Sequence, residues 1–419
     1  MTPEVKKRIE QIRQGIVPEG YKKTESGIIP NEWRVGQVSK CIEEYKFFSN
    51  DISHIPVYSS SRKGLVPQSD YYNQREAVET NLGYKVVPQG YVTYRHMSDD
   101  DVFHFNINKT GENVLVSSEY PVFTSSDNCD LSFLISVLNN TARFRYFCKM
   151  QKLGGTRTRL YLDNLKRYAL ALPPFDEQKK IAEILATQDK AIELQGRKIE
   201  ELKRFKKGCL ERMFPRKGQK VPEKRFPGFT DDWEQRKLGG VTTSYSGGTP
   251  TVGVKEYYDG QIPFIRSAEI NSESTELFIS EKGLNVSSAR LVSKGDILYA
   301  LYGATSGEVG RARLEGAINQ AILAIKPMDN YDAEYLSQWL RKSKQNIVET
   351  YLQGGQGNLS GAIVKELIVD FPSYNEQQII GQYFANLDRL ITLHQRKLEE
   401  MKRQKKALMQ LLLTGIERV

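Results

Sequence analysis

The sequence of 419 residues contains few side chains of the kinds that bind transition metals or form disulfides. It has only four histidines, and none lies at metal-ligand spacing from another histidine or a cysteine. The cysteines are also few and scattered, with no C-x-x-C pair to suggest a zinc site or a redox dithiol: Cys41, Cys129, Cys148 and Cys209. We therefore expect reduced thiols and no transition-metal site.

Long hydrophobic runs are missing too. The longest, such as Ala321 to Ile325, fall far short of the roughly 20 apolar residues that a membrane-spanning helix requires. The N-terminal stretch MTPEVKKRIEQIRQG is charged throughout and lacks the apolar region of a signal peptide. With 39% hydrophobic and 26% charged residues, the composition is that of a soluble globular protein, and we expect a cytoplasmic location.

The signatures of several enzyme classes are absent as well. The sequence contains no GxxxxGK[ST] phosphate-binding loop, and its GQG at 355–357 does not continue into a GxGxxG nucleotide-binding loop. The LPPF at 172–175 resembles the tetrapeptide with which adenine methyltransferases hold their target amine, but Leu172 stands where a polar residue is required. No carboxylate-plus-lysine nuclease pattern is present either. These absences predict a chain without catalytic machinery of its own.

The chain does carry an excess of positive charge. It has 60 Lys and Arg against 51 Asp and Glu, which gives a formal net charge of +9 and an isoelectric point near 9.1. Such a balance favours a polyanionic partner.

The strongest signal in the sequence is a long internal repeat. The segment FDEQKKIAEILATQDKAIELQGRKIEELKRFKK, which begins at Phe175, matches YNEQQIIGQYFANLDRLITLHQRKLEEMKRQKK, which begins at Tyr374, without a gap. Glu177, for example, corresponds to Glu376, 199 residues later (376 minus 177). Each copy follows a proline and continues with helix-forming residues, which predicts the start of a helix.

Both copies show the alternating spacing of four and three that is typical of a heptad seam. The seam residues are Ile181, Leu185, Ile192, Ile199, Leu202, Ile380, Phe384, Leu387, Ile391, Leu398 and Met401. Polar residues interrupt the two seams at corresponding places, Gln195 with His394 and Lys206 with Lys405. Such interruptions either fix register and partner or, for the lysines, extend toward water. For His394 we favour a packed or register-setting role over a catalytic one.

Weaker matches extend the repeat beyond the helices. They pair IPNEW at 29–33 with FTDDW at 229–233, the helix N-cap candidates Asp130 and Asp332, and the glycine pairs at 154–155 and 354–355. The chain is therefore expected to comprise an N-terminal helical segment (1–27), a globular domain (28–172), a helix (173–215), a second globular domain (216–371) and a second helix (372–419). Each domain is expected to be mixed α/β, with strands near 91–94, 103–107, 262–265, 297–301 and 317–325 and helices near 131–138 and 333–340.

Between these matches the two halves diverge, as in YSSSRKGLVPQSDYY against YSGGTPTVGVKEYYD. Two identical domains would bind one element twice, whereas divergent domains on matched helices are suited to two different elements. Basic, amide and hydroxyl side chains in the loops are candidates for contacts with DNA bases or phosphates. They are Ser61, Arg62, Lys63, Arg95, Thr156, Arg157, Thr158, Arg159, Lys255, Arg266, Gln353, Gln356 and Asn358. For any one of them taken alone, an ordinary solvated loop side chain is favoured over a base contact.

Together, the paired Glu-Gln helices, the Ile-Pro-x-x-Trp motif and Gly-Asp-Ile-Leu at 295–298 resemble the specificity (S) subunit of type I restriction-modification systems over nearly the whole chain. The resemblance implies two α/β target-recognition domains joined by two long antiparallel coiled-coil helices with a pseudo-twofold repeat. Each domain would read half of a split site in double-stranded DNA. In the first domain, QGYV at 89–92 departs from the Gly-Asp-Ile-Leu form.

The resemblance also implies partners. Methyltransferase (M) subunits, with an expected number of two, would dock on the helices, and restriction (R) subunits would join this core. S-adenosylmethionine, ATP and magnesium would be used by those partners, so no cofactor is expected on this chain. Two alternatives remain at this point: a coiled-coil adaptor without sequence-specific DNA binding, and a protein related to DNA methyltransferases.

Overall fold

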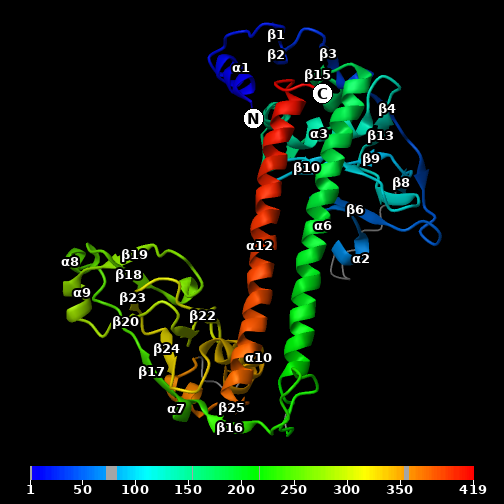
Figure 1. Ribbon diagram of the computed structural model, residues 1–419. Helices are drawn as coiled ribbons and strands as arrows, with labels where there is room; N and C mark the ends of the chain where they lie inside the picture. The colour runs from blue at the N-terminus through cyan, green and yellow to red at the C-terminus, as the bar shows by residue number, and fades with distance from the viewer. Residues whose placement is uncertain (1, 72–82, 153, 217, 353–357) are drawn as a thin grey trace. The chain divides into compact units, whose positions relative to one another are not determined.

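The computed structural model describes residues 2–71, 83–152, 154–216, 218–352 and 358–419 (Figure 1). The chain forms two compact units. Unit 1 comprises residues 1–194 together with 397–419, and unit 2 comprises residues 195–396. Each unit therefore contains one mixed α/β segment and a portion of each long helix. No helix in the described part of the chain is long and apolar enough to cross a membrane.

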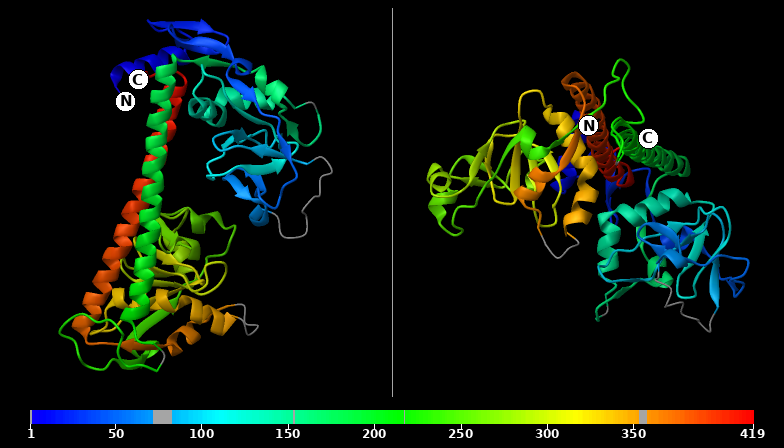
Figure 2. Two further views of the ribbon diagram at one scale, coloured as in Figure 1. Left: turned by 90° about the vertical axis from the view of Figure 1, so that its right-hand side faces the viewer. Right: turned by 90° about the horizontal axis from the view of Figure 1, so that it is seen from below.

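The repeated segments form the long helices α6 (Phe175–Met213) and α12 (Tyr374–Leu413), of 39 and 40 residues. In each unit a stretch of α6 lies beside a stretch of α12, and the two run antiparallel (Figures 1 and 2). Every seam residue predicted from the heptads is buried or half-buried, whereas most of the positions between them are exposed. In unit 2 the polar interruption is a direct contact, because Gln195 Nε2 donates to the carbonyl oxygen of His394 at 2.8 Å.

In unit 1 the helices outside the long pair are α1 (Pro3–Arg13), α2 (Gln68–Tyr71), α3 (Leu131–Asn140), α4 (Ala142–Lys149) and α5 (Leu162–Lys166), with a 3-10 turn η1 (Val38–Lys40). Its strands are β1 (Tyr21–Thr24), β2 (Gly27–Pro30), β3 (Arg34–Gln37), β4 (Ile42–Glu44), β5 (Phe48–Ser49), β6 (Tyr58–Ser61), β7 (Gly64–Pro67), β8 (Tyr84–Val87), β9 (Val92–Thr93), β10 (Met97–Ser98), β11 (Asn106–Ile107), β12 (Val114–Ser117), β13 (Val122–Ser125), β14 (Thr158–Arg159) and β15 (Ala169–Leu172).

In unit 2 the helices are α7 (Leu238–Val241), α8 (Lys255–Tyr258), α9 (Glu281–Asn285), α10 (Ala333–Leu352) and α11 (Gly361–Glu366), with a 3-10 turn η2 (Ser267–Glu269). The strands are β16 (Glu234–Lys237), β17 (Thr242–Ser246), β18 (Ile262–Ile265), β19 (Leu277–Ile279), β20 (Arg290–Val292), β21 (Ile297–Ala300), β22 (Val309–Arg311), β23 (Gly316–Ile318), β24 (Ile322–Pro327) and β25 (Ile368–Phe371).

One four-stranded sheet has the same topology in both units, although the sequences differ. Its order is β11-β9-β13-β4 in unit 1 and β22-β21-β24-β17 in unit 2. If the strands of each sheet are numbered along the chain, both orders are third, second, fourth and first. A short antiparallel ladder closes each segment just before its long helix. β3 pairs with β15 in unit 1, and β16 pairs with β25 in unit 2. In each unit an early strand, β3 or β16, therefore meets the last strand before the long helix at the start of that helix.

The second sheet is where the units differ. Unit 1 has a three-stranded sheet, β12-β8-β5, and a separate hairpin of β6 and β7. Unit 2 has a four-stranded sheet, β19-β18-β23-β20, in which β18 and β23 are parallel. The repeat is thus retained near the helices and lost in the second sheet.

Several sequence predictions need correction at this level. The N-terminal segment 1–27 is helical only in α1, which ends before Gly15 at φ 75°, and it continues into the β1–β2 hairpin. The expected strand at 103–107 is reduced to β11. The expected strand at 317–325 is divided between β23 and β24, which belong to different sheets. The helix expected at 333–340 continues to Leu352.

Candidate nucleic-acid interface

The residues that attach each α/β segment to its long helix are repeated between the units. Gln178 in α6 donates from Nε2 to the Pro173 carbonyl at 3.0 Å and accepts from the Asp130 backbone N–H at 2.9 Å. Gln377 in α12 makes the same two contacts with Pro372 and Asp332, both at 2.9 Å. Asp130 and Asp332 in turn cap α3 and α10, as the sequence predicted. Each glutamine therefore joins the start of a long helix to the start of a domain helix.

The glutamates beside these glutamines are also matched. Glu376 is fully buried and accepts two hydrogen bonds from Arg225, from Nε and Nη2, both at 2.7 Å. Glu177, also buried, accepts from Arg418 at 3.0 and 2.9 Å and from Trp33 Nε1 at 3.2 Å. Two-point arginine–carboxylate contacts fix geometry as well as charge. In unit 1 the arginine that binds the start of α6, Arg418, comes from the C-terminal residues. In unit 2 the arginine that binds the start of α12, Arg225, comes from the segment after α6.

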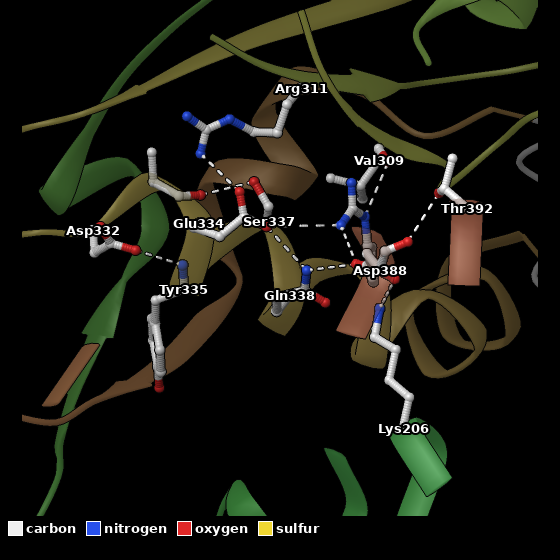
Figure 3. Close-up of polar contacts among 12 residues, drawn as sticks. Lys206, Val309, Arg311, Asp332, Glu334, Tyr335, Ser337, Gln338, Asp388 and Thr392 are labelled. Atoms are coloured by element: carbon white, nitrogen blue, oxygen red, sulfur yellow. Dashed lines mark hydrogen bonds and ion pairs between the residues drawn. The ribbon is translucent and has the colours of Figure 1, made fainter. Parts of the chain in front are cut away.

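Further along the helices the two units differ. In unit 2, Asp388 of α12 accepts from Lys206 of α6 at 2.6 Å, and from Gln338 and Arg341 of α10 at 2.9 and 3.2 Å (Figure 3). Arg341 also donates to the carbonyl of Val309 in β22. The network ties the sheet and α10 to both long helices.

In unit 1 the corresponding Asp189 has a simpler environment. It pairs with Lys405 of α12, and its side chain is 61% exposed. A cavity of about 680 Å³ adjoins it, with a lining that includes Ser136, Asn139 and Asn140 of α3. At this position the α/β segment of unit 1 therefore lacks the polar contacts to its helix pair that unit 2 has.

In unit 1 the predicted interface begins at the β6–β7 hairpin, which carries Ser61, Arg62 and Lys63. The hairpin is held to the edge of the four-stranded sheet by Asn106 of β11, whose Nδ2 donates to Ser60 Oγ at 2.7 Å and to the Ser61 carbonyl at 2.9 Å. Arg62 and Lys63 lie at the hairpin turn and are exposed. The turn therefore presents two cationic side chains from a fixed backbone.

A pocket of about 460 Å³ joins this hairpin to the segment after β9. Its wall includes Arg62, Lys63 and Arg95, and its apolar lining includes Val66 and Phe103. The structure thus brings together the first two groups of residues that the sequence singled out, although they are about 30 positions apart in the chain.

The third group, Thr156 to Arg159, lies next to the same segment. β14 pairs with β10, so Arg159 is opposite Met97. Arg157 donates from Nε to Asp99 at 2.8 Å, and Arg62 donates to Asp100 at 2.6 Å.

The predicted residues of this group differ in exposure. Thr158 is buried and donates its hydroxyl to Asp101, so it faces the protein in this structure, whereas Thr156, Arg157 and Arg159 are exposed. The sequence analysis missed Asp99, Asp100 and Asp101, which stand out only as a run of acids.

Two histidines lie within this basic region, and both are biased toward the neutral form. Burial, with help from the Arg62 guanidinium, lowers the pKa of His104. Burial also lowers the pKa of His96, against the attraction of Glu119, and the nearby Arg159 and Lys85 act in the same direction as burial. The positive charge of this surface at neutral pH therefore comes from arginine and lysine.

In unit 2 the predicted residues are placed differently. Lys255 begins α8 and is exposed, and Arg266 follows β18. Arg266 is held by two carboxylates, with contacts to Glu269 at 3.1 Å and to Glu276 at 2.6 Å. Burial tends to raise the pKa of Glu269, but hydrogen bonds from Arg266 and backbone N–H groups outweigh it and lower the pKa to about 2. Arg266 is consequently a fixed group, although it lines a pocket of about 410 Å³ with Thr249 and Asn319.

The last predicted residues of unit 2 lie near the start of α11. Asn358 is exposed, and its neighbour Leu359 donates its backbone N–H to the carbonyl of Leu301 beyond β21. Gln353 and Gln356 lie outside the described residues. Sequence reasoning also missed the partners Arg225 and Arg418, because no local pattern marks an arginine whose glutamate is 151 or 241 positions away.

Comparison with known proteins agrees with this division into two matched parts. The sequence matches the family "Type I restriction modification DNA specificity domain" twice, at residues 35–204 and 230–403. A Methanocaldococcus jannaschii protein provisionally named as the MjaX specificity subunit of a type I restriction enzyme is 24% identical over 96% of this chain and 97% of its own length. The MjaIX specificity subunit of the same organism is 32% identical over 38% of this chain and 39% of its own length.

Solved structures show the same fold. The crystal structure of a type I restriction-modification S subunit from M. genitalium aligns with a TM-score of 0.60 at 14% identity, over 91% of this chain and 96% of that one. A chain from a study of complex assembly in a type I system aligns with a TM-score of 0.56 at 15% identity, over 93% and 99%. With the double sequence match, the matched helix attachments and this shared fold, the chain belongs to the family of type I restriction-modification DNA specificity domains and contains two of them.

Proposed function

We propose that this chain gives a type I restriction-modification complex its DNA sequence specificity, with each unit reading one half of a split double-stranded target. The observation that carries the proposal is the contrast between repeated attachments and divergent surfaces. Gln178 and Glu177 recur as Gln377 and Glu376 with the same kinds of contact, while the second sheets and their loops do not correspond. A pair of identical readers would have no need of that divergence.

The surface of unit 1 has the chemistry that DNA reading requires. Arg62, Lys63, Arg95 and Arg159 come from three segments that meet around one pocket and the adjoining β10–β14 pair. Arginine and lysine provide phosphate contacts that position a protein on the duplex, and arginine also pairs with guanine in the major groove. In unit 2 we assign the same role to the region of Lys255, Arg266 and Asn358.

The chemistry of the complex belongs, in this proposal, to partner subunits. M subunits, two in number, would dock on the long helices, and R subunits would join through them. Exposed apolar side chains on these helices support a protein partner, namely Leu194 and Phe205 of α6 and Leu390 and Leu393 of α12. The chain itself would act without a catalytic centre, and the partners would use S-adenosylmethionine, ATP and magnesium.

A domain exchange tests this function. Replacing residues 28–172 with the corresponding segment of a homologue should change one half of the methylated motif and leave the other half intact. Methylome sequencing of a host that carries the complete system gives the readout. A motif altered in both halves, or in neither, would contradict independent reading. Methyl transfer by the isolated chain would contradict the non-catalytic role. If gel shifts showed no DNA binding either with or without M subunits, the chain would be an adaptor instead.

A single substitution tests the surface of unit 1. Arg159→Ala should weaken binding of the M-containing complex to its DNA by about 1 to 3 kcal/mol if the side chain contacts a base. Arg212→Ala removes the same charge from the exposed side of α6 and should change the affinity much less. Gel-shift titrations over a range of salt concentrations make the comparison. Equal effects of the two substitutions would remove β14 from the interface.

A further inference from the structure

Three consecutive aspartates in unit 1 each contact a different residue among those that the sequence singled out as DNA-contact candidates. Asp99 Oδ1 accepts from Arg157 Nε at 2.8 Å, and Asp100 Oδ2 accepts from Arg62 Nη2 at 2.6 Å. Asp101 accepts the hydroxyl of Thr158. The segment that carries the aspartates follows β10 directly and borders the pocket between the hairpin and Arg95. The three aspartates therefore lie among the basic residues of the proposed DNA surface.

These ion pairs do little for the stability of the fold. The Arg157 and Asp99 side chains are 50% and 66% exposed, and ion pairs as exposed as this one contribute little to stability. They do, however, restrict the arginine. With Nε donated to Asp99, the two terminal nitrogens of Arg157 remain for a second partner. These nitrogens provide the parallel N–H pair that binds O6 and N7 of guanine.

The charge of the pair also selects among DNA groups. An arginine that is neutralised by an adjacent carboxylate gains little from a phosphate, because the carboxylate repels the same anion. A guanine edge carries no net charge and requires a fixed donor geometry, which the carboxylate provides. An aspartate beside an arginine therefore disfavours phosphate and favours the base.

We infer that Asp99 is a specificity-determining positioning residue, which holds Arg157 to read a guanine in the first half-site and keeps it from acting as a phosphate ligand. Asp100 holds Arg62 in a similar way, with its second oxygen fixed by Ser98 Oγ at 2.9 Å. This inference rests on the proposed function and deepens it by naming the base that unit 1 reads and the residue that directs the reading.

The test uses the complex with M subunits after its motif has been determined by methylome sequencing. Dissociation constants are measured at several salt concentrations for the cognate duplex, for duplexes with single base-pair changes and for an unrelated duplex. Asp99→Asn should lower the ratio of cognate to unrelated affinity by about tenfold, because one directed base contact is lost. It should also steepen the dependence of log K on log salt by about one unit, because Arg157 becomes a phosphate ligand.

Glu112→Gln is the matched control. Glu112 is an exposed acid in the same unit that forms no ion pair among the residues described, so its substitution removes the same charge without releasing an arginine. It should raise both affinities equally. Arg157→Ala should relax discrimination at one guanine–cytosine pair and leave the salt slope nearly unchanged.

If Asp99→Asn behaves like Glu112→Gln in both ratio and slope, the inference is overturned. The same holds if Arg157→Ala flattens the salt slope and leaves base discrimination intact, because Arg157 would then be a phosphate ligand in the native protein. Either result leaves the proposed function standing. That function fails on a different result, namely a domain exchange that does not alter the motif.

Discussion

The two units use matched residues to attach their α/β segments to the long helices, but the polar attachments of unit 2 are more deeply buried and have more partners. Arg225, the partner of Glu376, is 14% exposed, whereas Arg418, the partner of Glu177, is 37% exposed. Asp388 binds three partners, whereas Asp189 pairs with Lys405 beside an open cavity. Sequence repetition therefore preserves where an attachment lies, but not how deeply it is buried or how many partners it has. Both depend on the neighbours, which diverge.

The most destabilising substitutions are expected at the two arginine–glutamate contacts. Arg225→Ala should destabilise unit 2 by about 3 to 5 kcal/mol, because it leaves the carboxylate of Glu376 buried without a countercharge. Arg418→Ala should cost less, about 1 to 3 kcal/mol, because Glu177 keeps the hydrogen bond from Trp33 and its partner is nearer to solvent. Hydrogen exchange of the amides in each unit measures the two losses separately. Equal losses would show that the difference in burial has no energetic consequence.

An intermediate effect is expected at the matched aspartates. Asp388→Ala should destabilise unit 2 by about 1 to 3 kcal/mol, because Lys206 is only 13% exposed and loses its countercharge. Asp189→Ala should cost about 0 to 1 kcal/mol, as is usual for an ion pair with an exposed member. Urea unfolding followed by hydrogen exchange provides the comparison. A larger loss at Asp189 would contradict this order.

The sequence predicted those features of this comparison that depend on local pattern. Heptad spacing identified the buried side of each long helix, and Asp130 and Asp332 were recognisable as helix caps before the helices were known. Both long helices begin close to their prolines, as expected. The shared strand order of the four-stranded sheets could not be predicted from the sequence, because strands as short as Val92–Thr93 carry almost no periodic signal.

Two strand predictions were wrong for reasons that the structure makes plain. Phe103 and Phe105 are both buried, which produces the alternating pattern of a strand. The backbone N–H and carbonyl of Phe105, however, bond to the side chain of Asn139 at 2.9 and 3.0 Å, so an amide replaces the partner strand. In the segment 317–325, Asn319 forms a turn through its side chain and carbonyl, and this turn separates β23 from β24. Where a side chain takes the place of a partner strand in binding the backbone, the sequence shows no periodic pattern that reveals it.

The contacts of the candidate interface and of the helix attachments were unpredictable for a different reason. Arg157 and Asp99 are 58 positions apart, and Arg225 and Glu376 are 151 apart. Their meeting depends on the sheet topology, which the sequence did not reveal. The residue types and the loops that carry them were visible, but their partners were not.

The last comparison concerns how the stability of each unit depends on pH. It involves His96 in unit 1 and Glu269 in unit 2, and its effect at neutral pH is the smallest of those expected here. Burial lowers the pKa of His96 in unit 1, so the stability gained from a neutral ring is complete above the unfolded pKa of about 6.5 and is lost as the pH falls toward the folded pKa. In unit 2 the Arg266 contacts lower the pKa of Glu269 to about 2, so its contribution is complete above about 4.5 and is lost as the pH falls through about 2.

Unit 1 should consequently begin to lose stability at a higher pH than unit 2. NMR titration of labelled histidine and glutamate side chains in the full chain gives both folded pKa values directly. His96→Gln should remove the part of the decline that begins near pH 6.5, while Arg266→Ala should raise the pKa of Glu269 toward its ordinary value, because the strongest of its hydrogen bonds is lost. A His96 ring that titrates at or above 6.5, or a Glu269 carboxyl that titrates near 4.5 in the unaltered chain, would contradict this order.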